Sequence, residues 1–526
     1  MKTFGIASSA ALAAIGAVQA TAVPRQASGN GMQIAWASYL PTYSADWDRL
    51  IGYSNAKFPV LVANVINGPD STVNADWKKI IDKAAKAGKK VLGYVRTGYL
   101  SHGSAQFNTY FTNRLDSNAT ADWIAQIEKD VDTWYDLYGS SIGGIFFDEG
   151  INDCQYADIY AHLNNYTKRK HPGAYTVVNP GTRVDQCFEN TMDTLLTFEH
   201  DYKTYTDGYK PYELGWTPKD PRKIWHIVYD VPESGVSNVV SLANQRKAGV
   251  IETTTGVLPN PYNTVPADSY MQALVNAVGG NVPLVANAAA YPGGPASSAP
   301  KNLDSTDTDF SAISLQWSAA ANAVAYRVYQ GDKVAVEVPK TFTSVQVGSL
   351  TPNTSYTFTV RSVDGTGKES ANSNAITDKT EALPRGSSIA DLQATVNGAN
   401  TVYTAEILLP YGNERLFIWQ GENTCSGSGY FFYIGTNYVC AKYLFEAGSF
   451  YRYNGQNGQW GWEWLAGGIA VERNKHNYKW TLPNGQITID STQFVVQTEN
   501  YNPSNAVVYP CPKFADPNSA TCTTWP

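Results

Sequence analysis

The sequence predicts a (β/α)8 barrel of the TIM type followed by two all-β domains, and three observations support this fold class. Between residues 31 and 285, short apolar runs alternate with amphipathic helical stretches, which is typical of βα units around a parallel sheet. Eight such runs fit into roughly 250 residues, the usual size of this barrel. Beyond residue 300 the pattern changes to short alternating runs rich in aromatic residues, which indicates antiparallel β structure.

Each of the eight apolar runs is followed by a helical stretch or by a crossover. The stretch of residues 75–87, for example, is amphipathic and ends at Gly88, as expected of a helix with a glycine after its last turn. The expected strands are residues 32–39, 60–66, 90–97, 143–148, 174–179, 194–198, 223–230 and 249–254.

The fourth expected strand ends abruptly in two acids. Residues 143–150 read Gly-Gly-Ile-Phe-Phe-Asp-Glu-Gly, so Asp148 and Glu149 come directly after a buried apolar run. An acidic pair at this place can solvate a turn or cap the next helix, but in a barrel it also lies at the C-terminal face, where catalytic residues are found. Because side chains alternate along a strand, both acids face inward only if the strand has ended, and Gly150 permits that turn.

Acidic and amide side chains also follow the other strands. Cleavage of a glycosidic bond requires two carboxyl groups that flank it, one protonated and one ionised. Glu199 on the sixth strand could face the acids of the fourth, so the expected catalytic residues are Asp148, Glu149 and Glu199. The expected substrate-binding residues at strand ends are Tyr39, Asn64, Arg96, Tyr99, Asn179, Asp230 and Glu252.

Several motifs in this region occur together and in order. They are Ser38-Tyr39, residues 62–69 (Val-Ala-Asn-Val-Ile-Asn-Gly-Pro), residues 93–99 (Gly-Tyr-Val-Arg-Thr-Gly-Tyr), residues 144–149 and Asn179-Pro-Gly181. With them the first half of the chain resembles the spherulin-4-like family, glycoside hydrolase family 135. The resemblance implies a (β/α)8 fold and endo-cleavage of α-1,4-linked, galactosamine-containing fungal exopolysaccharide. It also implies that Asp148, Glu149 and Glu199 are the catalytic acids. Chitinase-like barrels instead carry an Asp-x-Asp-x-Glu pattern on the fourth strand, which this chain lacks.

The N-terminus predicts secretion. Residues 1–20 combine Lys2, an apolar run and the small-residue pattern Val18-Gln19-Ala20, as expected of a signal peptide. No later stretch reaches the roughly 20 apolar residues of a membrane-spanning helix. We therefore expect an extracellular or cell-wall-associated protein without a membrane anchor.

Six cysteines in an oxidising compartment predict three disulfides. Proximity in sequence is the only basis for choosing among about 15 pairings, and it gives Cys154–Cys187, Cys425–Cys440 and Cys511–Cys522. Secretion also gives meaning to three N-glycosylation sequons, at Asn118, Asn165 and Asn353.

The chain continues, after a linker at residues 286–300 rich in Ala, Pro, Gly and Ser, into the first all-β domain, residues 301–380. Three segments of this domain carry a resemblance, namely residues 315–317 (Leu-Gln-Trp), 325–329 (Ala-Tyr-Arg-Val-Tyr) and 350–361. With them the domain resembles a fibronectin type III sandwich that has a tyrosine corner at Tyr356. The resemblance implies that Trp317 and Tyr356 belong to the core, and that the module is a spacer.

Residues 388–526 form the second all-β domain, rich in Trp, Tyr, Gly and Asn. Trp460, Trp462 and Trp464 would lie on one face of a strand. If that face is exposed, the rings can stack on sugar units and the domain is a carbohydrate-binding module; if it is buried, they form a sandwich core.

Composition argues against several partners. The net charge of −7 leaves no basic surface for nucleic acid or an anionic membrane. The cysteines lack Cys-x-x-Cys spacing and the six histidines are scattered, so neither a metal nor another cofactor is expected. The sequence thus predicts a secreted endo-acting hydrolase of a fungal or microbial polysaccharide. The alternatives are a carbohydrate-binding wall or matrix protein without catalysis, and a structural glycoprotein.

Overall fold

The structure is a computed structural model. It describes residues 31–382 apart from 103–112, 115–116, 212–214, 259, 281 and 291. Beyond these it describes residues 389–397, 400–407, 414–418, 429–434, 437–446, 449–455, 461–466, 471–474, 477–483, 494–498 and 506–509.

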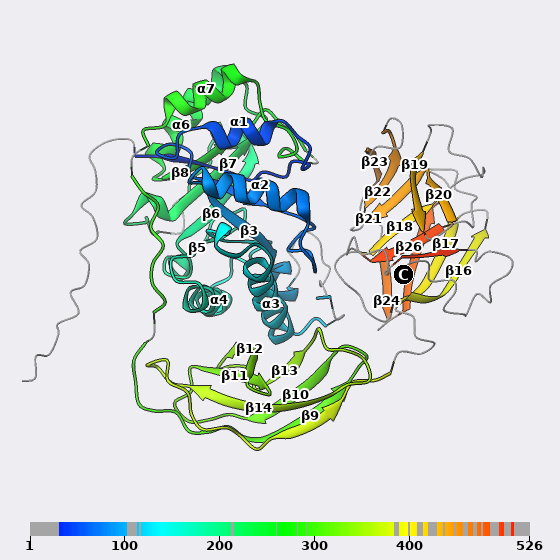
Figure 1. Cartoon of the computed structure of the whole chain (residues 1–526). Coiled ribbons are helices and arrows are strands. Elements are labelled where there is room, and N and C mark those ends of the chain that lie inside the picture. Colours follow the sequence, from blue (N-terminus) through cyan, green and yellow to red (C-terminus); the bar gives the residue numbers. More distant parts are fainter. Residues whose placement is uncertain are drawn as a thin grey trace, which may run out of the picture.

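The first domain is a closed barrel of eight parallel strands in sequence order, so the predicted fold class is confirmed (Figure 1). Strand β1 closes the barrel by pairing with β2 on one side and with β8 on the other. The strands are β1 (Gln33–Trp36), β2 (Val60–Ala63), β3 (Lys90–Arg96), β4 (Gly144–Asp148), β5 (Tyr175–Val178), β6 (Thr194–Asp201), β7 (Ile224–Tyr229) and β8 (Val250–Thr253).

Helices surround this barrel. They are α1 (Asp46–Gly52), α2 (Ala75–Lys86), α3 (Thr120–Tyr138), α4 (Ala157–Lys170), α5 (Tyr202–Thr206), α6 (Val236–Gln245) and α7 (Asp268–Ala277). In α2 the side chain of Asn74 accepts hydrogen bonds from the first helical N–H groups, which fixes the start of the helix. The connection from β5 to β6 contains only a short 3-10 turn, Gln186–Phe188, in place of a helix.

Alternate residues of the strands fill the barrel interior. One apolar cluster takes such residues from all eight strands, among them Tyr94, Phe146 and Trp225, and Leu284 and Ala286 pack against it. The residues of opposite phase pack against the helices in a separate cluster. The interior is therefore a packed core, and the polar residues of the site lie above it at the C-terminal strand ends.

Strand β6 contains a β-bulge. Leu196 pairs with Trp225 and Phe198 with His226, so Thr197 is an extra residue without a partner on β7. The bulge reverses the alternation, and consequently both Leu196 and Glu199 point to the barrel interior. Tyr209 fixes the bulge because its hydroxyl donates to the backbone oxygen of Thr197 at 3.0 Å.

The second domain is a two-sheet antiparallel sandwich with strand orders β13-β10-β9 and β12-β11-β14-β15. Trp317 is buried, and the backbone N–H of Thr351 donates to the hydroxyl of Tyr356 at 2.8 Å, as in a tyrosine corner. The strands are β9 (Lys301–Thr308), β10 (Ile313–Ser318), β11 (Ala325–Gln330), β12 (Lys333–Pro339), β13 (Ser344–Val347), β14 (Ser355–Val363) and β15 (Ile376–Lys379).

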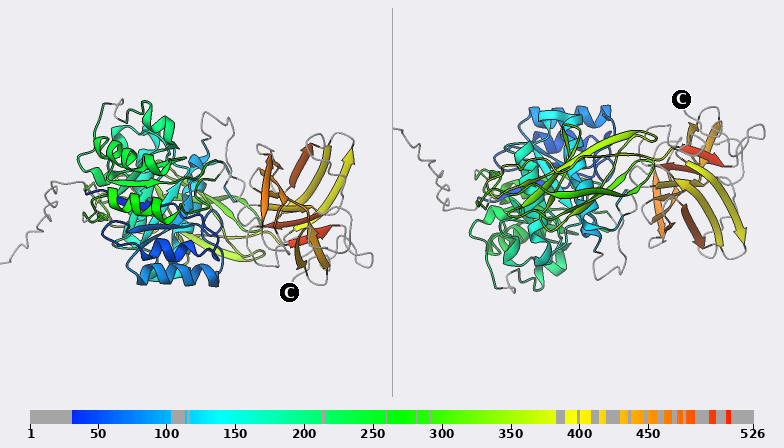
Figure 2. Two further views of the ribbon diagram at one scale, coloured as in Figure 1. Left: turned by 90° about the horizontal axis from the view of Figure 1, so that it is seen from above. Right: turned by 90° about the horizontal axis from the view of Figure 1, so that it is seen from below.

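The sandwich packs on the barrel helices and is more than a spacer. Helices α3 and α4 face strands β12 and β13, and the view from below shows the sandwich strands crossing the barrel domain (Figures 1 and 2). Glu128 of α3 accepts a hydrogen bond from the backbone N–H of Glu337 at 2.7 Å. His162 of α4 has its Nε2 2.9 Å from Glu128 Oε1 and 3.1 Å from the backbone oxygen of Glu337. Buried ionisable groups thus join the two domains.

The described part of the C-terminal domain is all β, as predicted. Its sheets have the orders β16-β17-β25-β24, β23-β22-β21-β18-β26-β27 and β19-β20. The strands are β16 (Ile389–Asn397), β17 (Asn400–Ile407), β18 (Glu414–Ile418), β19 (Tyr430–Ile434), β20 (Asn437–Ala441), β21 (Tyr443–Glu446), β22 (Ser449–Tyr453), β23 (Trp462–Ala466), β24 (Val471–Asn474), β25 (Asn477–Pro483), β26 (Phe494–Thr498) and β27 (Ala506–Tyr509).

Candidate functional site

Asp148 is the last residue of β4 and points to the barrel mouth. It follows Phe146 in the interior phase and lies beside Arg96 of β3 in register. The hydroxyl of Tyr94 donates to its Oδ2 at 2.7 Å, and the Nδ2 of Asn179 donates to its Oδ1 at 2.8 Å. Both carboxylate oxygens of Asp148 are therefore held by neighbouring strands.

Glu149 follows the strand in a left-handed conformation, with φ of 54°. This turn ends the alternation of β4, so Glu149 also faces the strand ends, where its Oε2 accepts from Arg96 Nε at 2.7 Å. Thr97 fixes the turn, because its hydroxyl donates to the backbone oxygens of Asp148 and Glu149, each at 2.8 Å. Both acids therefore face the mouth of the barrel. Asp148 is bonded to Tyr94 and Asn179, and Glu149 is bonded to Arg96.

Glu199 joins the same hydrogen-bond network from β6. Its Oε2 accepts from Asn179 Nδ2 at 2.8 Å, and its Oε1 accepts from the hydroxyl of Tyr262 at 2.5 Å. The amide nitrogen of Asn179 therefore donates to Asp148 and to Glu199 at once. Since each of these bonds is 2.8 Å long, the two acceptor oxygens lie no more than 5.6 Å apart.

Asn179 is held in turn by its own loop. Its side-chain oxygen accepts from the backbone N–H of Gly181 at 2.7 Å, which leaves the amide group turned toward the acids. This assigns the oxygen and the nitrogen of the amide from the hydrogen-bond network.

Burial and like charges act on the carboxyl of Asp148. Burial, followed by the charges of Glu199 and Glu149, raises its pKa to about 7, although the hydrogen bond from Tyr94 opposes the shift. Burial also raises the pKa of Tyr39, Tyr94 and Tyr262 well above the ordinary value, and the nearby carboxylates raise it further. The tyrosines therefore remain hydroxyl donors.

Glu252 lies deeper than the other acids. Its side chain is fully buried, and its Oε2 accepts from the backbone N–H of Ala37 at 2.8 Å. Burial raises its pKa well above the usual range. Burial thus favours the protonated form of this carboxyl below the mouth.

The other predicted binding residues differ in position. Tyr39 packs edge-to-face on Tyr94 and Tyr262, with ring centroids 5.9 and 5.6 Å away. Asn64 donates to Asn67 at 3.5 Å, and both residues lie in the loop after β2. Asp230 is exposed, and the structure does not bring it into that cluster.

Tyr99 belongs to a strained segment beside Glu149. Gly98, Tyr99, Leu100 and Ser101 all have positive φ, between 48° and 73°, which is rare for residues other than glycine. The N–H of Tyr99 donates to the backbone oxygen of Glu149 at 2.8 Å. The strained turn thus places the ring of Tyr99 near the acids, whose charges, after burial, contribute to the raised pKa of its hydroxyl.

The sequence analysis missed Tyr262 and the role of Tyr94. Tyr262 lies in the loop after β8, nine positions beyond the strand end, and no local pattern marks it as a partner of Glu199. Tyr94 occurs in the sequence analysis only as part of the motif at residues 93–99, without a role of its own. Its position two residues before Arg96, in the same strand phase, could have indicated a contact with the mouth.

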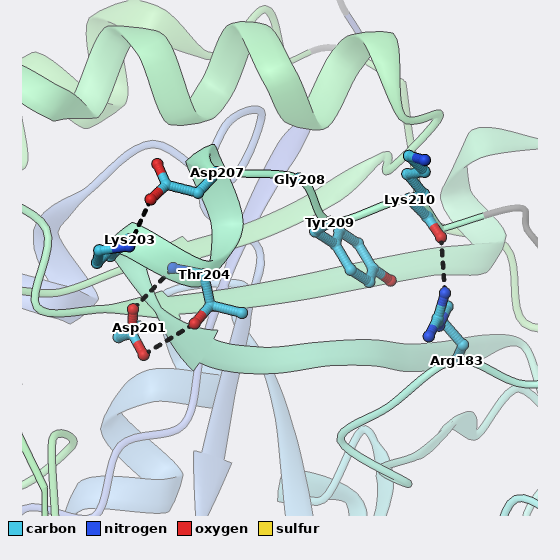
Figure 3. Close-up of a pocket in the computed structure, with 8 residues that line it drawn as sticks. All are labelled: Arg183, Asp201, Lys203, Thr204, Asp207, Gly208, Tyr209 and Lys210. Atoms are coloured by element: carbon cyan, nitrogen blue, oxygen red, sulfur yellow. Dashed lines mark hydrogen bonds and ion pairs between the residues drawn. The ribbon is translucent and has the colours of Figure 1, made fainter.

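A surface hollow of about 560 Å³ lies beside β6 and α5 (Figure 3). None of the acids discussed above lines it, and its charged groups already have partners. Lys203 pairs with Asp207 at 2.6 Å, and Arg183 donates to the backbone oxygen of Lys210 at 3.2 Å. We therefore locate the candidate site at the carboxylates. The lining residues are Arg183, Asp201, Lys203, Thr204, Asp207, Gly208, Tyr209 and Lys210.

One predicted disulfide, Cys154–Cys187, is confirmed and ties the loop after β4 to the loop after β5. Cys440 is also disulfide-bonded. Cys425, Cys511 and Cys522 lie outside the described residues, as does Trp460.

The glycosylation sequons differ in accessibility. Asn118 and Asn353 are exposed. Asn165 is half-buried in α4, and its side-chain oxygen accepts from the backbone N–H of Ala290 at 2.9 Å. A glycan is therefore easier to accommodate at Asn118 and Asn353 than at Asn165.

Two of the three candidate sugar-stacking tryptophans are among the described residues. Trp464 is 49% exposed, whereas Trp462 is half-buried between the rings of Tyr430 and Tyr453. Among these residues Trp464 offers its ring to solvent.

The described residues contain no helix long and apolar enough to cross a membrane. Over the same residues, no group of three or more His, Cys, Asp or Glu side chains is arranged to hold a metal ion.

Known proteins resemble parts of this chain. Chitinase A1 of Niallia circulans is 36% identical over 158 residues, 28% of this chain and 22% of that protein. Spherulin-4 of Physarum polycephalum is 24% identical over 222 residues, 41% of this chain and 57% of that protein. The chain thus spans less than two thirds of either relative. Among solved structures, Aspergillus clavatus Sph3 in complex with GalNAc is 20% identical with a TM-score of 0.38, covering 47% of this chain and 98% of Sph3.

Family models match both of the first two domains. Residues 33–278 match the spherulation-specific family 4, and residues 298–379 match the fibronectin type III domain. The chain therefore carries a spherulation-specific family 4 domain followed by a fibronectin type III domain.

Proposed function

We propose that this protein is a glycoside hydrolase that uses Asp148 and Glu199 as its pair of catalytic carboxyl groups. The observation that carries the proposal is the bridge through Asn179, which holds one oxygen of each acid within 5.6 Å of the other. The relatives named chitinase and spherulin-4 support a carbohydrate substrate.

The two acids have environments that suit opposite roles. Asp148, with a pKa raised to about 7, keeps a proton near neutral pH and can donate it to the leaving glycosidic oxygen. Glu199 accepts hydrogen bonds from Asn179 and Tyr262, which stabilise the carboxylate needed to attack the anomeric carbon.

A separation of about 5 to 5.5 Å between the two carboxyl groups is typical of retaining glycosidases. The limit of 5.6 Å between the acceptor oxygens of Asp148 and Glu199 is compatible with this value. In the proposed reaction a bond forms between Glu199 and the anomeric carbon as the glycosidic oxygen leaves with the proton of Asp148. Water then cleaves the glycosyl ester while Asp148 takes a proton back. Glu149, which accepts a hydrogen bond from Arg96, would lie close to the developing positive charge of the sugar ring.

For the substrate we propose a fungal or microbial polysaccharide cleaved internally, outside the cell. The resemblance of the motifs to the spherulin-4-like hydrolases supports an α-1,4-linked polymer that contains galactosamine. The C-terminal domain would add a binding surface at Trp464.

Reducing-end release from such polymers tests the hydrolase proposal. We expect Asp148→Asn and Glu199→Gln to lose at least a thousandfold in kcat, and Glu149→Gln to lose less, with Asp158→Asn on the exposed face of α4 as the matched control. Full activity of Glu199→Gln would refute the assignment. Binding of the polymer without cleavage by the wild type would favour the non-catalytic alternative.

The C-terminal proposal has a separate test. We expect Trp464→Ala in the full chain to weaken retention on insoluble polysaccharide about threefold to tenfold, since one stacking contact is lost. Val285→Ser, an exposed change outside this domain, is the control. Equal retention of Trp464→Ala and wild type would reject the role of this ring.

A further inference from the structure

Exposed apolar side chains gather at the carboxylate end of the barrel. Six large hydrophobic side chains of the described residues are strongly exposed, and four of them lie in the loops after β1, β2 and β8. These four are Tyr43 (75% exposed), Val73 (47%), Val257 (57%) and Leu258 (65%). Because β8, β1 and β2 are adjacent in the closed barrel, their loops are neighbours at its C-terminal face. We call residues 37–45, 64–74, 254–258 and 260–267 together the neutral shelf.

Two of the three loops are fastened to each other. Arg49, just beyond the first loop in α1, donates to Asp268 Oδ1 at 2.8 Å and to the backbone oxygen of Pro266 at 2.7 Å. The loop carrying Tyr43 and the loop carrying Leu258 are therefore parts of one fixed surface.

The neutral shelf is continuous with the acids. Tyr262, which donates to Glu199, comes from the loop after β8, and its ring packs edge-to-face on Tyr39 of the loop after β1. A polymer bound at Glu199 and extending in this direction would next meet the shelf.

The shelf carries almost no charge. Its three loops contain a single charged residue, Asp70, which is only 3% exposed. The hollow beside β6, by contrast, is lined by Arg183, Lys203 and Lys210 together with two aspartates. Nucleic acid or an anionic membrane would require exposed cations on the shelf. Exposed apolar side chains among amides and hydroxyls instead suit the C–H faces and hydroxyls of an uncharged sugar chain.

We propose that the neutral shelf binds uncharged sugar units of the substrate chain on one side of the bond to be cleaved, with Tyr43 stacked on a distal unit. This inference rests on the proposed hydrolase function and extends it: it assigns a place to the part of the polymer that does not react. Such a shelf would let the protein bind a long polysaccharide at units within the chain, next to the bond that is cleaved.

Binding by the inactive Glu199→Gln chain tests the shelf without interference from cleavage. The probes are an α-1,4-linked galactosamine-containing exopolysaccharide in its N-acetylated form and the same polymer after de-N-acetylation, which is cationic. We expect the N-acetylated polymer to bind more tightly. Adding Tyr43→Ala or Leu258→Ser should weaken its binding about threefold to tenfold, whereas Val285→Ser, exposed near the other end of the barrel, should not.

Several results would overturn the proposal: unchanged affinity in both shelf variants, tighter binding of the cationic polymer, or no binding by the Glu199→Gln parent. Dimerisation of the wild type that is lost in Leu258→Ser would assign the shelf to a second copy of the chain instead. The hydrolase proposal is tested separately, by comparing cleavage of the polymer by the wild type and by Glu199→Gln. Both of these proteins have an unchanged shelf, so the two proposals can fail independently.

Discussion

At the scale of single residues, the geometry of the candidate site depends on Asn179. Its one amide nitrogen donates to two acids that come from strands on either side of β5, and its oxygen is fixed by Gly181. It was predicted as a substrate-binding residue, but here its hydrogen-bonding capacity is largely used within the protein. We therefore regard Asn179 as a positioning residue.

Loss of the bridge should affect turnover more than substrate binding. We expect Asn179→Ala to lower kcat about a hundredfold with a small change in KM, because the two acids lose their mutual alignment. Asn152→Ala, which removes an exposed amide bonded to the backbone oxygen of Arg183, is the matched control. A large rise in KM with kcat unchanged would show that Asn179 contacts substrate instead.

The raised pKa of Asp148 predicts the pH dependence of the reaction. A general acid must be protonated, so kcat should fall as pH rises through about 7. Glu199 is the charge that contributes most to this shift after burial, so Glu199→Gln should lower the pKa of Asp148. Infrared titration of the carboxyl groups in that variant measures this directly. A wild-type rate that is constant from pH 6 to 8 would exclude Asp148 as the acid.

How much of the site could be predicted varies residue by residue. Asp148, Glu149 and Glu199 could be identified because acids directly after apolar runs mark strand ends. Tyr262 could not, since its contact with Glu199 depends on the path of a long loop. The sequence also could not show which side chains bond to Asp148 and which to Glu149. That difference follows from the positive φ of Glu149, which is stabilised by tertiary contacts with Thr97 and Tyr99.

At the scale of elements, all eight barrel strands could be predicted from apolar runs, and their ends are shorter or longer by a few residues. The bulge at Thr197 could not be predicted, because this residue is as compatible with a regular strand as its neighbours. Without the bulge, Glu199 would point to the same side of the strand as Thr197. It would then point away from the barrel interior, into which Leu196 points. The orientation of the sixth-strand acid therefore follows from pairing with β7, which local sequence does not encode.

Close packing of β4 against β5 explains a glycine at the start of the catalytic strand. A Cβ at Gly144 would lie 1.9 Å from the backbone oxygen of Tyr175, which cannot move without breaking the sheet. We expect Gly144→Ala to destabilise the barrel by about 3 kcal/mol. Gly52→Ala, where a Cβ meets nothing within 4 Å, should change stability by less than about 0.5 kcal/mol. Urea unfolding of both variants measures the difference, and equal midpoints would contradict the packing argument.

At the scale of the whole molecule, the sandwich is docked on the barrel helices through buried charged groups. Charged residues of both domains converge on Glu337, whose Oε2 lies 2.6 Å from Arg169 of α4. Arg327 of the sandwich pairs with the same oxygen. The sequence analysis predicted a spacer from the resemblance to a fibronectin type III module. The charged residues of this contact are far apart in the chain, so local sequence does not indicate that they meet. Only the docking of α3 and α4 on β12 makes them a buried cluster.

This cluster should make domain docking sensitive to pH. Burial raises the pKa of Glu128 to about 7. Burial alone would lower the pKa of His162, but the hydrogen bond with Glu128, together with the charges of Glu128 and Glu337, outweighs this and raises it. Burial alone would raise the pKa of Glu337, but the charges of His162, Arg169 and Arg327 outweigh it and lower it.

The directions of the pKa shifts of Glu128, His162 and Glu337 determine whether docking of the two domains strengthens or weakens as pH rises. A group whose pKa is raised by folding stabilises the folded state at low pH, and that contribution disappears as pH rises through the folded-state pKa. Glu128 and His162 both act in this direction, so docking should weaken as pH rises through about 7. Glu337 acts oppositely, and its contribution disappears only in acid. Docking should therefore be strongest in mildly acidic solution.

We predict that the wild type loses about 2 kcal/mol of stability between pH 5 and pH 8 through this cluster, and that Glu128→Gln loses much less because it cannot ionise. Calorimetric transition temperatures of the full chain at several pH values measure the difference, with the exposed Asp158→Asn as a control that keeps the wild-type slope. Identical slopes for wild type and Glu128→Gln would mean that the interface does not titrate. A steeper slope in Glu128→Gln would reverse the sign and show that the ionised carboxylate is the form that joins the two domains.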